Sequence, residues 1–292
     1  MLHEIKFTSQ KTQAEINREW DVIVPARDAQ QRAGDVSFLQ VLRPWIGAAV
    51  NGAKRILDVG CGSGRLTQTL RLAGARGARA SNGAQAARQS DDDPLADDLA
   101  NLAADLDNPA GDLGNRDETR QSQTVHVVGV DPSPKSIALA RASNPHETYH
   151  VGTLESFAAQ NPSQRFDLAV ANMVLMDAPD LDGLLKGVAR LVPGGRFVAT
   201  IAHPAFWPLY LGYAGKESFS YGNETFIEAP YVVNNRSFKS ATTHIHRPVS
   251  RYISAFTQAG MVITRMEELR GTEPRSVFPF PRFLAIEARV DS

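Results

Sequence analysis

The chain has 292 residues, 42% of them hydrophobic and 22% charged, and a formal net charge of −1 at pH 7. This composition is typical of a globular protein with an ample core, and the balanced charge argues against a partner with a strong negative field, such as nucleic acid or an acidic membrane. The single cysteine excludes an internal disulfide and a cysteine-rich zinc site.

Residues 1–50 are expected to form a helical cap segment ahead of the main domain, which we place at 51–292. Residues 10–33 are polar and permit a helix, and Pro25 is expected to break or begin one there. Asp35 can cap a second helix. The apolar residues of this helix fall on one face, namely Phe38, Leu39, Leu42, Trp45, Ile46 and Ala49.

Residues 55–66 carry the most informative pattern of the chain. They read Arg-Ile-Leu-Asp-Val-Gly-Cys-Gly-Ser-Gly-Arg-Leu, which predicts a strand over 54–59, a glycine turn and the start of a helix. Alternating glycines leave no side chain in the way of a ligand and permit positive φ. The helix that follows offers unpaired N–H groups to that ligand. Asp58 closes the strand, at the sheet edge where open α/β sheets bind ligands.

The spacing of these glycines separates two kinds of nucleotide site. The dinucleotide fingerprint G-x-G-x-x-G requires a further glycine at a position that Arg65 or Thr67 occupies. The carboxylate of Asp58 also suits a cationic ligand better than a pyrophosphate, because like charges repel. A nicotinamide dehydrogenase is therefore disfavoured.

Asp58 and the three alternating glycines together resemble motif I of the class I S-adenosylmethionine-dependent methyltransferases, whose ligand carries a sulfonium and an ammonium. The resemblance implies a Rossmann-like, doubly wound α/β fold with a seven-stranded, mostly parallel sheet, a C-terminal antiparallel strand and helices on both faces. It implies S-adenosyl-L-methionine as the cofactor. It also implies that the cofactor is bordered by Asp58, Gly60, Cys61, Gly62 and Gly64.

Residues 74–123 interrupt the pattern and are expected to be a disordered insertion. They contain no valine, isoleucine, methionine, cysteine or aromatic residue, so they cannot bury enough apolar surface to offset the entropy of ordering. One alternative stays open, because the leucines at 95, 99, 102 and 106 recur at helical spacing. A short helix that docks on a partner would have this pattern.

Beyond the insertion, residues 125–130 predict a second strand that ends in Asp131. Without the insertion, Asp131 lies about 20 residues past the glycine loop, where an acidic residue meets ribose hydroxyls. Pro132 and Ser133 then open a helix through Ala142. In the family that the motif resembles, an acid at this place binds both ribose hydroxyls, so Asp131 and Pro132 are assigned to the cofactor.

A third strand over 148–151 leads into Gly152-Thr153-Leu154-Glu155. The family usually has Gly-Asp-Ala-Glu here, with the aspartate bonding the adenine amino group. Thr153 departs from that pattern, which leaves the adenine to backbone contacts at Leu154 or to Glu155. The fourth strand, 165–173, ends in Asn172 and Met173, which complete the expected cofactor site.

The remaining elements follow the cadence of the same family. A helix begins near Asp180 or Asp182, Pro193-Gly194-Gly195 forms a turn, and residues 196–202 form a fifth strand. Ser250 is expected to cap a helix that ends at Gly260. Residues 261–269 and 283–290 then predict an antiparallel hairpin that closes the sheet.

Residues 203–249 are too rich in aromatic residues for a disordered linker. We expect an ordered substrate cap over the carboxyl edge of the sheet, with an apolar pocket for a small organic methyl acceptor; the alternative is that the rings only pin the loop to the core. His203-Pro204 and His246-Arg247-Pro248 bracket the segment, and similar signatures occur in a bacterial subgroup of small-molecule methyltransferases.

Methyl transfer to an oxygen acceptor needs a base unless that oxygen is already ionised. His203 is the first candidate because it follows the fifth strand, although a histidine before proline is often a hydrogen-bonded turn residue. His246, His244 and Asp177 are the others. His244 and His246 would point the same way on an extended segment, but no third ligand has a suitable spacing, so no metal site is expected. Cys61 is expected in the loop for its small size, not as a nucleophile.

Two alternatives within this fold stay open. Enzymes that methylate exocyclic base nitrogens carry an Asn/Asp-Pro-Pro-aromatic turn after the fourth strand, where this chain has Asn172-Met173-Val174-Leu175, so a nucleic-acid substrate is disfavoured and a protein substrate lacks support. A non-catalytic cofactor-binding regulator or assembly factor is the second alternative. The polar start and the lack of a long apolar run favour a cytoplasmic protein without a membrane span; the oligomeric state stays open.

Overall fold

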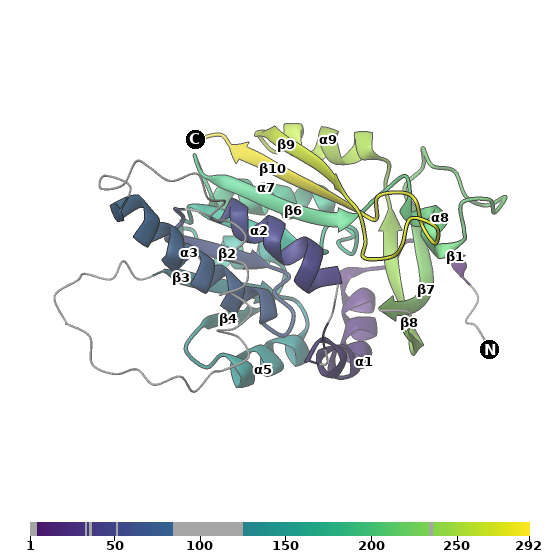
Figure 1. The fold of residues 1–292 in the computed structure, drawn as a ribbon, viewed down its shortest axis with the longest axis horizontal. Helices are drawn as coiled ribbons and strands as arrows, with labels where there is room; N and C mark the ends of the chain where they lie inside the picture. Colours follow the sequence, from purple (N-terminus) through teal and green to yellow (C-terminus); the bar gives the residue numbers. More distant parts are fainter. Residues whose placement is uncertain (1–4, 33, 35–36, 51, 84–124, 234–235) are drawn as a thin grey trace.

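A computed structural model describes residues 5–32, 34, 37–50, 52–83, 125–233 and 236–292. Its main feature is a seven-stranded sheet in the order β4-β3-β2-β5-β6-β10-β9 (Figure 1). The strands are β2 (Arg55–Val59), β3 (His126–Asp131), β4 (Thr148–Val151), β5 (Leu168–Asn172), β6 (Arg196–Ala202), β9 (Met261–Leu269) and β10 (Phe283–Val290). Strands β2 to β6 are parallel, and β10 runs antiparallel to both β6 and β9. The predicted fold class is confirmed.

The strand order reverses at β2, which pairs with β3 on one side and β5 on the other. In open α/β sheets a ligand crevice forms at this point, outside the carboxyl ends of the strands. Asp58 lies in β2 one residue before its end. The topology therefore puts the glycine loop and its acidic residue where a ligand is expected.

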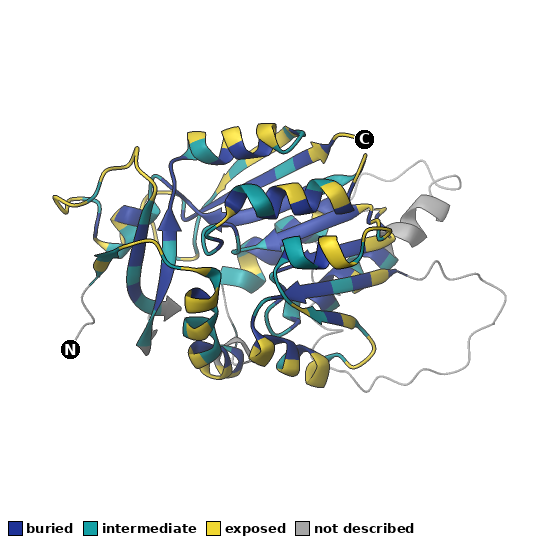
Figure 2. Ribbon diagram, turned by 180° about the vertical axis from the view of Figure 1, so that it is seen from behind, coloured by how far each residue is buried: buried dark blue, intermediate teal, exposed yellow. Residues whose placement is uncertain are grey.

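Helices cover both faces of this sheet, and its strands are buried between them (Figure 2). The helices that flank it are α2 (Arg43–Ala49), α3 (Arg65–Gly83), α5 (Pro134–Ser143), α6 (Leu154–Gln160), α7 (Leu181–Leu191) and α9 (Val249–Gln258). Adjacent residues of β2 serve different cores: Ile56 packs with α2 and α3, whereas Leu57 packs with α7 and α9. This alternation explains why β2 is apolar along most of its length.

Several helix ends are fixed by the side chains that precede them. Ser133, Thr153 and Asp180 each accept a hydrogen bond from a backbone N–H of the first turn of α5, α6 and α7. The predicted cap at Ser250 is wrong, because α9 already begins at Val249 with Pro248 before it. Proline fixes an extended backbone there and lacks the N–H that a helix start would leave unpaired.

Two further expectations about helices need correction. Pro25 lies inside α1 (Gln13–Arg32). The burial of Ile23 before it and of Asp28 after it holds the helix together despite the missing backbone hydrogen bond. Helix α3 continues to Gly83, so the start of the predicted insertion at 74 is helical, consistent with its alanines and arginines, which favour helix. The rest of the insertion, including the leucines at 95, 99, 102 and 106, and the expected cap residue Asp35 lie outside the described residues.

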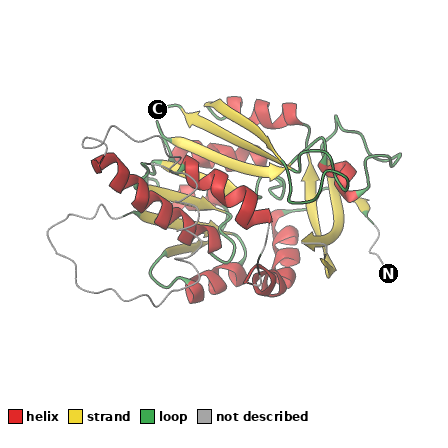
Figure 3. Ribbon diagram, in the orientation of Figure 1, coloured by secondary structure: helices red, strands yellow, loops and turns green. Residues whose placement is uncertain are grey.

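A second, smaller sheet stands beside the first (Figures 1 and 3). Its order is β1-β7-β8, all antiparallel, with β1 (Lys6–Thr8), β7 (Thr225–Val233) and β8 (Arg236–His246). Helix α1 contacts β8 on one side and α5 on the other. We call α1, this sheet and the short helix α8 (Trp207–Leu211) the cap lobe.

The cap lobe combines two segments that the sequence analysis treated separately, the N-terminal segment 1–50 and the cap at 203–249. Lys11 Nζ lies 2.6 Å from a carboxylate oxygen of Glu19, 2.8 Å from one of Glu228 and 2.8 Å from Thr243 Oγ1, so α1 is fixed to β7 and β8. The expected N-terminal segment and the expected cap at 203–249 thus build one unit. The π-helix η1 (Phe38–Leu42) leads from α1 back to α2. None of the helices in the described ranges combines the length and the hydrophobicity of a membrane span.

Candidate functional site

The glycine loop is an open turn held against β3. Gly60, Gly62 and Gly64 have φ values of 65°, 55° and 79°, which suit glycine and few other residues. The N–H of Gly60 donates to the carbonyl oxygen of Val130 at 2.8 Å. A Cβ on Gly60 would lie 2.4 Å from Val174, whereas one on Gly62 would meet nothing within 4 Å. The loop is thus tightly packed against Val174 at Gly60 and open at Gly62, which leaves space for a ligand there.

Two buried carboxylates flank this loop. Asp58 is 1% exposed and accepts a hydrogen bond from Thr67 Oγ1 at 2.6 Å. Burial raises the pKa of Asp58 to about 7, with the nearby Asp131 adding to the shift and the Thr67 hydroxyl opposing it. Asp131 accepts from the N–H of Gly62 at 2.9 Å and that of Ser133 at 2.8 Å. Burial raises its pKa as well. Such a pair favours a ligand with positive charge and hydroxyl donors.

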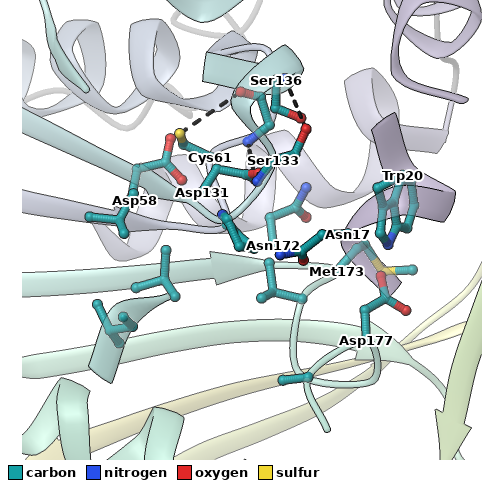
Figure 4. Close-up of a pocket in the computed structure, with 18 of the residues that line it drawn as sticks. Asn17, Trp20, Asp58, Cys61, Asp131, Ser133, Ser136, Asn172, Met173 and Asp177 are labelled. Atoms are coloured by element: carbon teal, nitrogen blue, oxygen red, sulfur yellow. Dashed lines mark hydrogen bonds between the residues drawn. The ribbon is translucent and has the colours of Figure 1, made fainter. Parts of the chain in front are cut away.

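The loop and the carboxylates open into one cavity at the ends of β2, β3 and β5 (Figure 4), which we call the glycine-loop cavity. The predicted cofactor residues that line it are Asp58, Gly60, Cys61, Gly62, Asp131, Pro132, Thr153, Leu154, Glu155, Asn172 and Met173. Gly64 is not part of the lining. A Cβ there would lie 2.6 Å from Tyr149 Oη, so Gly64 permits close packing behind the loop.

Two predicted residues are held by local constraints. The hydroxyl oxygen of Thr153 accepts from the N–H of Ser156 at 3.2 Å and caps α6. The side chain is therefore engaged at the helix end, although Thr153 lines the cavity together with Leu154 and Glu155. Cys61 is buried, and burial raises the pKa of its thiol well above the ordinary range. A protonated, buried thiol is a poor nucleophile.

Helix α1 supplies a side of this cavity that sequence reasoning missed. Its residues recur every three or four positions and present one face: Gln13, Asn17, Trp20, Val24 and Arg27. This spacing was a possible signal, but most of the stripe is polar and does not resemble a core face. Ser133 donates to the carboxylate of Asp21, which ties α1 to the start of α5 and closes the cavity.

A second cavity continues from the first into the cap lobe, and we call it the cap cavity. Both cavities share Trp20, Arg27, Phe38, Asn172, Met173 and Asp177. The remaining wall is mostly apolar and is formed by Leu42, Met176, Trp207, Leu211, Ala229, Pro230, Tyr231 and Phe283, with Ser37, Thr242, His244 and Arg282 as its polar members. A ligand in the cap cavity would therefore adjoin one in the glycine-loop cavity.

The boundary between the cavities holds a strained residue and an isolated carboxyl group. Met173 has φ of 59° and is the only non-glycine residue with positive φ in the described chain. Such strain concentrates at functional sites. Asp177 lies near Met173 and Trp20 (Figure 4), and burial raises its pKa to about 8 although Arg27 and Arg247 oppose the shift. Among the described residues, no side chain hydrogen-bonds this carboxyl group.

Arg247 fixes the loop that carries Asp177. It is 1% exposed, and its guanidinium donates to the carbonyl oxygens of Leu175 at 3.0 Å and Ala178 at 2.8 Å. Its Nε also donates to Glu224 at 2.7 Å. The N–H of Ile245 donates to the carbonyl oxygen of Met176. The end of β8 and the Asp177 loop are therefore one connected unit.

The histidine candidates lie elsewhere or are engaged. His203 lines neither cavity; its Nε2 lies 2.9 Å from Glu268 and its Nδ1 accepts from the N–H of Ala205. His246 also lines neither, and its Nε2 bonds the carbonyl oxygen of Tyr221 at 2.9 Å. His244 faces the cap cavity, with Nε2 3.1 Å from the Tyr213 hydroxyl, and burial lowers its pKa to about 3. No group of ligands suited to a metal occurs among the residues that the structure describes.

The sequence of this chain is similar to those of known methyltransferases. A family model described as a methyltransferase domain matches residues 36–260. The ubiquinone biosynthesis O-methyltransferase of Aromatoleum aromaticum is 27% identical over 154 residues, which are 51% of this chain and 44% of that enzyme. The match thus spans less than half the length of that relative.

Solved structures share the fold at low identity. A 1,6-didemethyltoxoflavin-N1-methyltransferase of Burkholderia thailandensis is 14% identical, with a TM-score of 0.54 over 99% of this chain and 95% of that one. The [4+2]-cyclase SpnF is 13% identical, with a TM-score of 0.54 over 98% of each chain. A S-adenosylmethionine-dependent methyltransferase of Clostridium acetobutylicum is 13% identical, with a TM-score of 0.53 over 94% of this chain and 99% of that one.

Proposed function

The chain belongs to the methyltransferase domain family and uses S-adenosyl-L-methionine, and on that premise we propose that it transfers a methyl group to the oxygen or nitrogen of a small organic acceptor in the cap cavity. The observation that carries the proposal is the continuity of the two cavities, which share Asn172, Met173 and Asp177. A mostly apolar, partly enclosed cavity suits a small molecule. The names of the Aromatoleum and Burkholderia enzymes point to small acceptors too.

The loop residues fit the cofactor in charge and in shape. When bound, S-adenosylmethionine supplies an activated methyl group and its own leaving group. Asp131 would accept the ribose hydroxyls, because its carboxylate is already oriented by the N–H groups of Gly62 and Ser133. Asp58 complements positive charge, and Gly62 leaves space in front of the loop. Leu154 and Glu155 are the proposed contacts of the adenine, since Thr153 is engaged as a helix cap.

Asp177 is the proposed base for an acceptor that must lose a proton. Among the described residues, it is the only acidic residue that lines both cavities. A pKa of about 8 suits proton removal near neutral pH, and a cationic neighbour would favour its ionised form. Arg247 holds the loop in place through Leu175 and Ala178. His203 and His246 are not proposed, because neither lines a cavity.

A label-transfer experiment tests this function. The protein is incubated with methyl-labelled S-adenosylmethionine and either the small-molecule or the macromolecular fraction of a cell extract. Label in a small product supports the proposal, and label confined to protein or nucleic acid refutes it. Calorimetric binding of S-adenosylhomocysteine without any transfer would indicate the non-catalytic binder instead. Asp131→Ala is the control, and we expect it to lose most cofactor affinity and all transfer.

A further inference from the structure

We propose that the methyl acceptor is a planar aromatic compound with an acidic substituent, and that Arg27 binds this anionic group. The inference rests on the proposed function and specifies its substrate class. It is drawn from three features of the cap cavity: the aromatic side chains of its wall, the few charged groups that face it, and the contact of Arg27 with two rings.

The aromatic side chains of the wall come from distant parts of the chain. They are Trp20 of α1, Phe38 of η1, Trp207 of α8, Tyr231 of β7 and Phe283 of β10. Aromatic walls favour flat, apolar ligands, because rings stack or meet edge to face with large contact area. The other apolar residues of the wall are Leu42, Met173, Met176, Leu211, Ala229 and Pro230. The body of the acceptor should therefore be an unsaturated ring.

Few charged side chains line the cap cavity. Asp177 is the one acidic residue among the described residues that line the cap cavity, and burial raises its pKa to about 8. The cations are Arg27 and Arg282. Arg282 is already paired with Glu273 and lies over the ring of Tyr210. Arg27 is thus the cation that a ligand can neutralise.

Among the described residues no carboxylate forms an ion pair with Arg27, although its charge acts on Asp131 and Asp177. Its guanidinium carbon lies 5.3 Å from the ring of Trp20 and 5.8 Å from that of Tyr231. Its Nε is buried and has no hydrogen-bond partner among the residues that the structure describes. The two rings contact each other as well as the guanidinium, with their centroids 5.5 Å apart. They orient the guanidinium from one side, and its in-plane donors match a carboxylate in two-pronged geometry. A buried unpaired donor is costly, so a ligand that satisfies it should bind well.

A carboxylate near Arg27 could come from the acceptor or from the amino-acid part of the cofactor, because Arg27 lines both cavities. The test separates these sources by saturating the protein with S-adenosylhomocysteine before any probe is added. The probes are 4-hydroxybenzoate, its neutral analogue 4-hydroxybenzamide, and 4-hydroxycyclohexanecarboxylate, which keeps the acid and loses the flat ring. Affinities are measured by calorimetry on wild type, Arg27→Gln, Arg27→Lys and Arg18→Gln. Arg18 is an exposed arginine of the same helix and serves as the matched control.

We expect 4-hydroxybenzoate to bind wild type at least about tenfold tighter than either analogue. The amide loses the charge-assisted hydrogen bond, and the saturated acid loses the contact of a flat ring with the aromatic wall. Arg27→Gln should abolish the preference for acid over amide while changing S-adenosylhomocysteine affinity less than about threefold. Arg27→Lys should retain part of the preference, and Arg18→Gln all of it.

Three results would overturn the inference. They are a wild-type protein that binds the cofactor but shows no preference for the aromatic acid, an Arg27→Gln variant whose preference is unchanged, and a loss confined to cofactor affinity, which would assign Arg27 to the cofactor. Wild type that fails to bind S-adenosylhomocysteine at all would refute the proposed function itself, and that failure is read before any probe is added. The wild-type comparison keeps the test decisive should a variant fail to fold.

Discussion

Replacement of Arg247 tests whether the cap lobe and the Asp177 loop are one energetic unit. In Arg247→Met the buried carbonyl oxygens of Leu175 and Ala178 lose their donors. Each unsatisfied buried group costs about 1–3 kcal/mol. Glu224 also loses its partner, but its side chain is 36% exposed and can be rehydrated. We therefore expect a loss of roughly 2–6 kcal/mol, a large share of the 5–15 kcal/mol typical of a domain.

Arg251→Met is the matched control for this experiment. Arg251 pairs with both carboxylate oxygens of Asp182 at 2.9 Å, but these side chains are 31% and 41% exposed. A solvent-exposed pair contributes about 0–1 kcal/mol. Urea denaturation followed by circular dichroism should therefore separate the two variants clearly. Equal losses, or a loss below about 1 kcal/mol for Arg247→Met, would refute the reasoning from burial.

Asp177→Asn should lower turnover about 10²–10⁴-fold while leaving S-adenosylhomocysteine affinity nearly unchanged, as labelled transfer and calorimetry would show. Burial raises the pKa of Asp177 from 3.8 to about 8. Between about pH 4 and pH 8 the folded protein therefore keeps a proton on Asp177 that the unfolded chain releases, so the free energy of unfolding decreases as the pH rises through this range. The variant should therefore gain stability relative to wild type over that range, and parallel pH profiles of the urea midpoints would contradict the assignment. Gly60→Ala and Gly62→Ala both need a positive φ, a shared cost of roughly 1–2 kcal/mol, but only the former brings Cβ within 2.4 Å of Val174. The midpoint of thermal unfolding should therefore be lower for Gly60→Ala than for Gly62→Ala, whereas Gly62→Ala should mainly weaken cofactor binding. A lower midpoint for Gly62→Ala would show that the loop packs differently.

The elements that the sequence predicted well are those whose signals are local. Strand β2 and the glycine loop follow from one continuous run of residues, and β9 and β10 have the predicted bounds of 261–269 and 283–290. Asp131 was located by its spacing once the insertion was set aside. These patterns are decided by neighbours within a few positions, and such patterns survive folding.

The features that were missed depend on contacts between distant residues. Nothing near residues 6–8 reveals a strand whose partner is β7, and the stripe of α1 that lines the glycine-loop cavity is too polar to resemble a core face. His203 occupies the predicted place at the end of β6, yet its ring is engaged by Glu268 and Ala205. The position of a residue along a strand predicts the edge of the sheet at which it lies. The direction of its side chain depends on hydrogen-bond partners that are distant in the sequence.

The pairing of β1 with β7 has a consequence for how the protein folds. Lys6 lies opposite Glu228, so the cap lobe cannot close until most of the polypeptide has emerged from the ribosome, whereas the glycine loop and its first neighbours are synthesised much earlier. Pairings of such high contact order are slow, because a long loop must close before they contribute. The nucleoside half of the site should therefore mature first, with the acceptor half assembling as a late folding event.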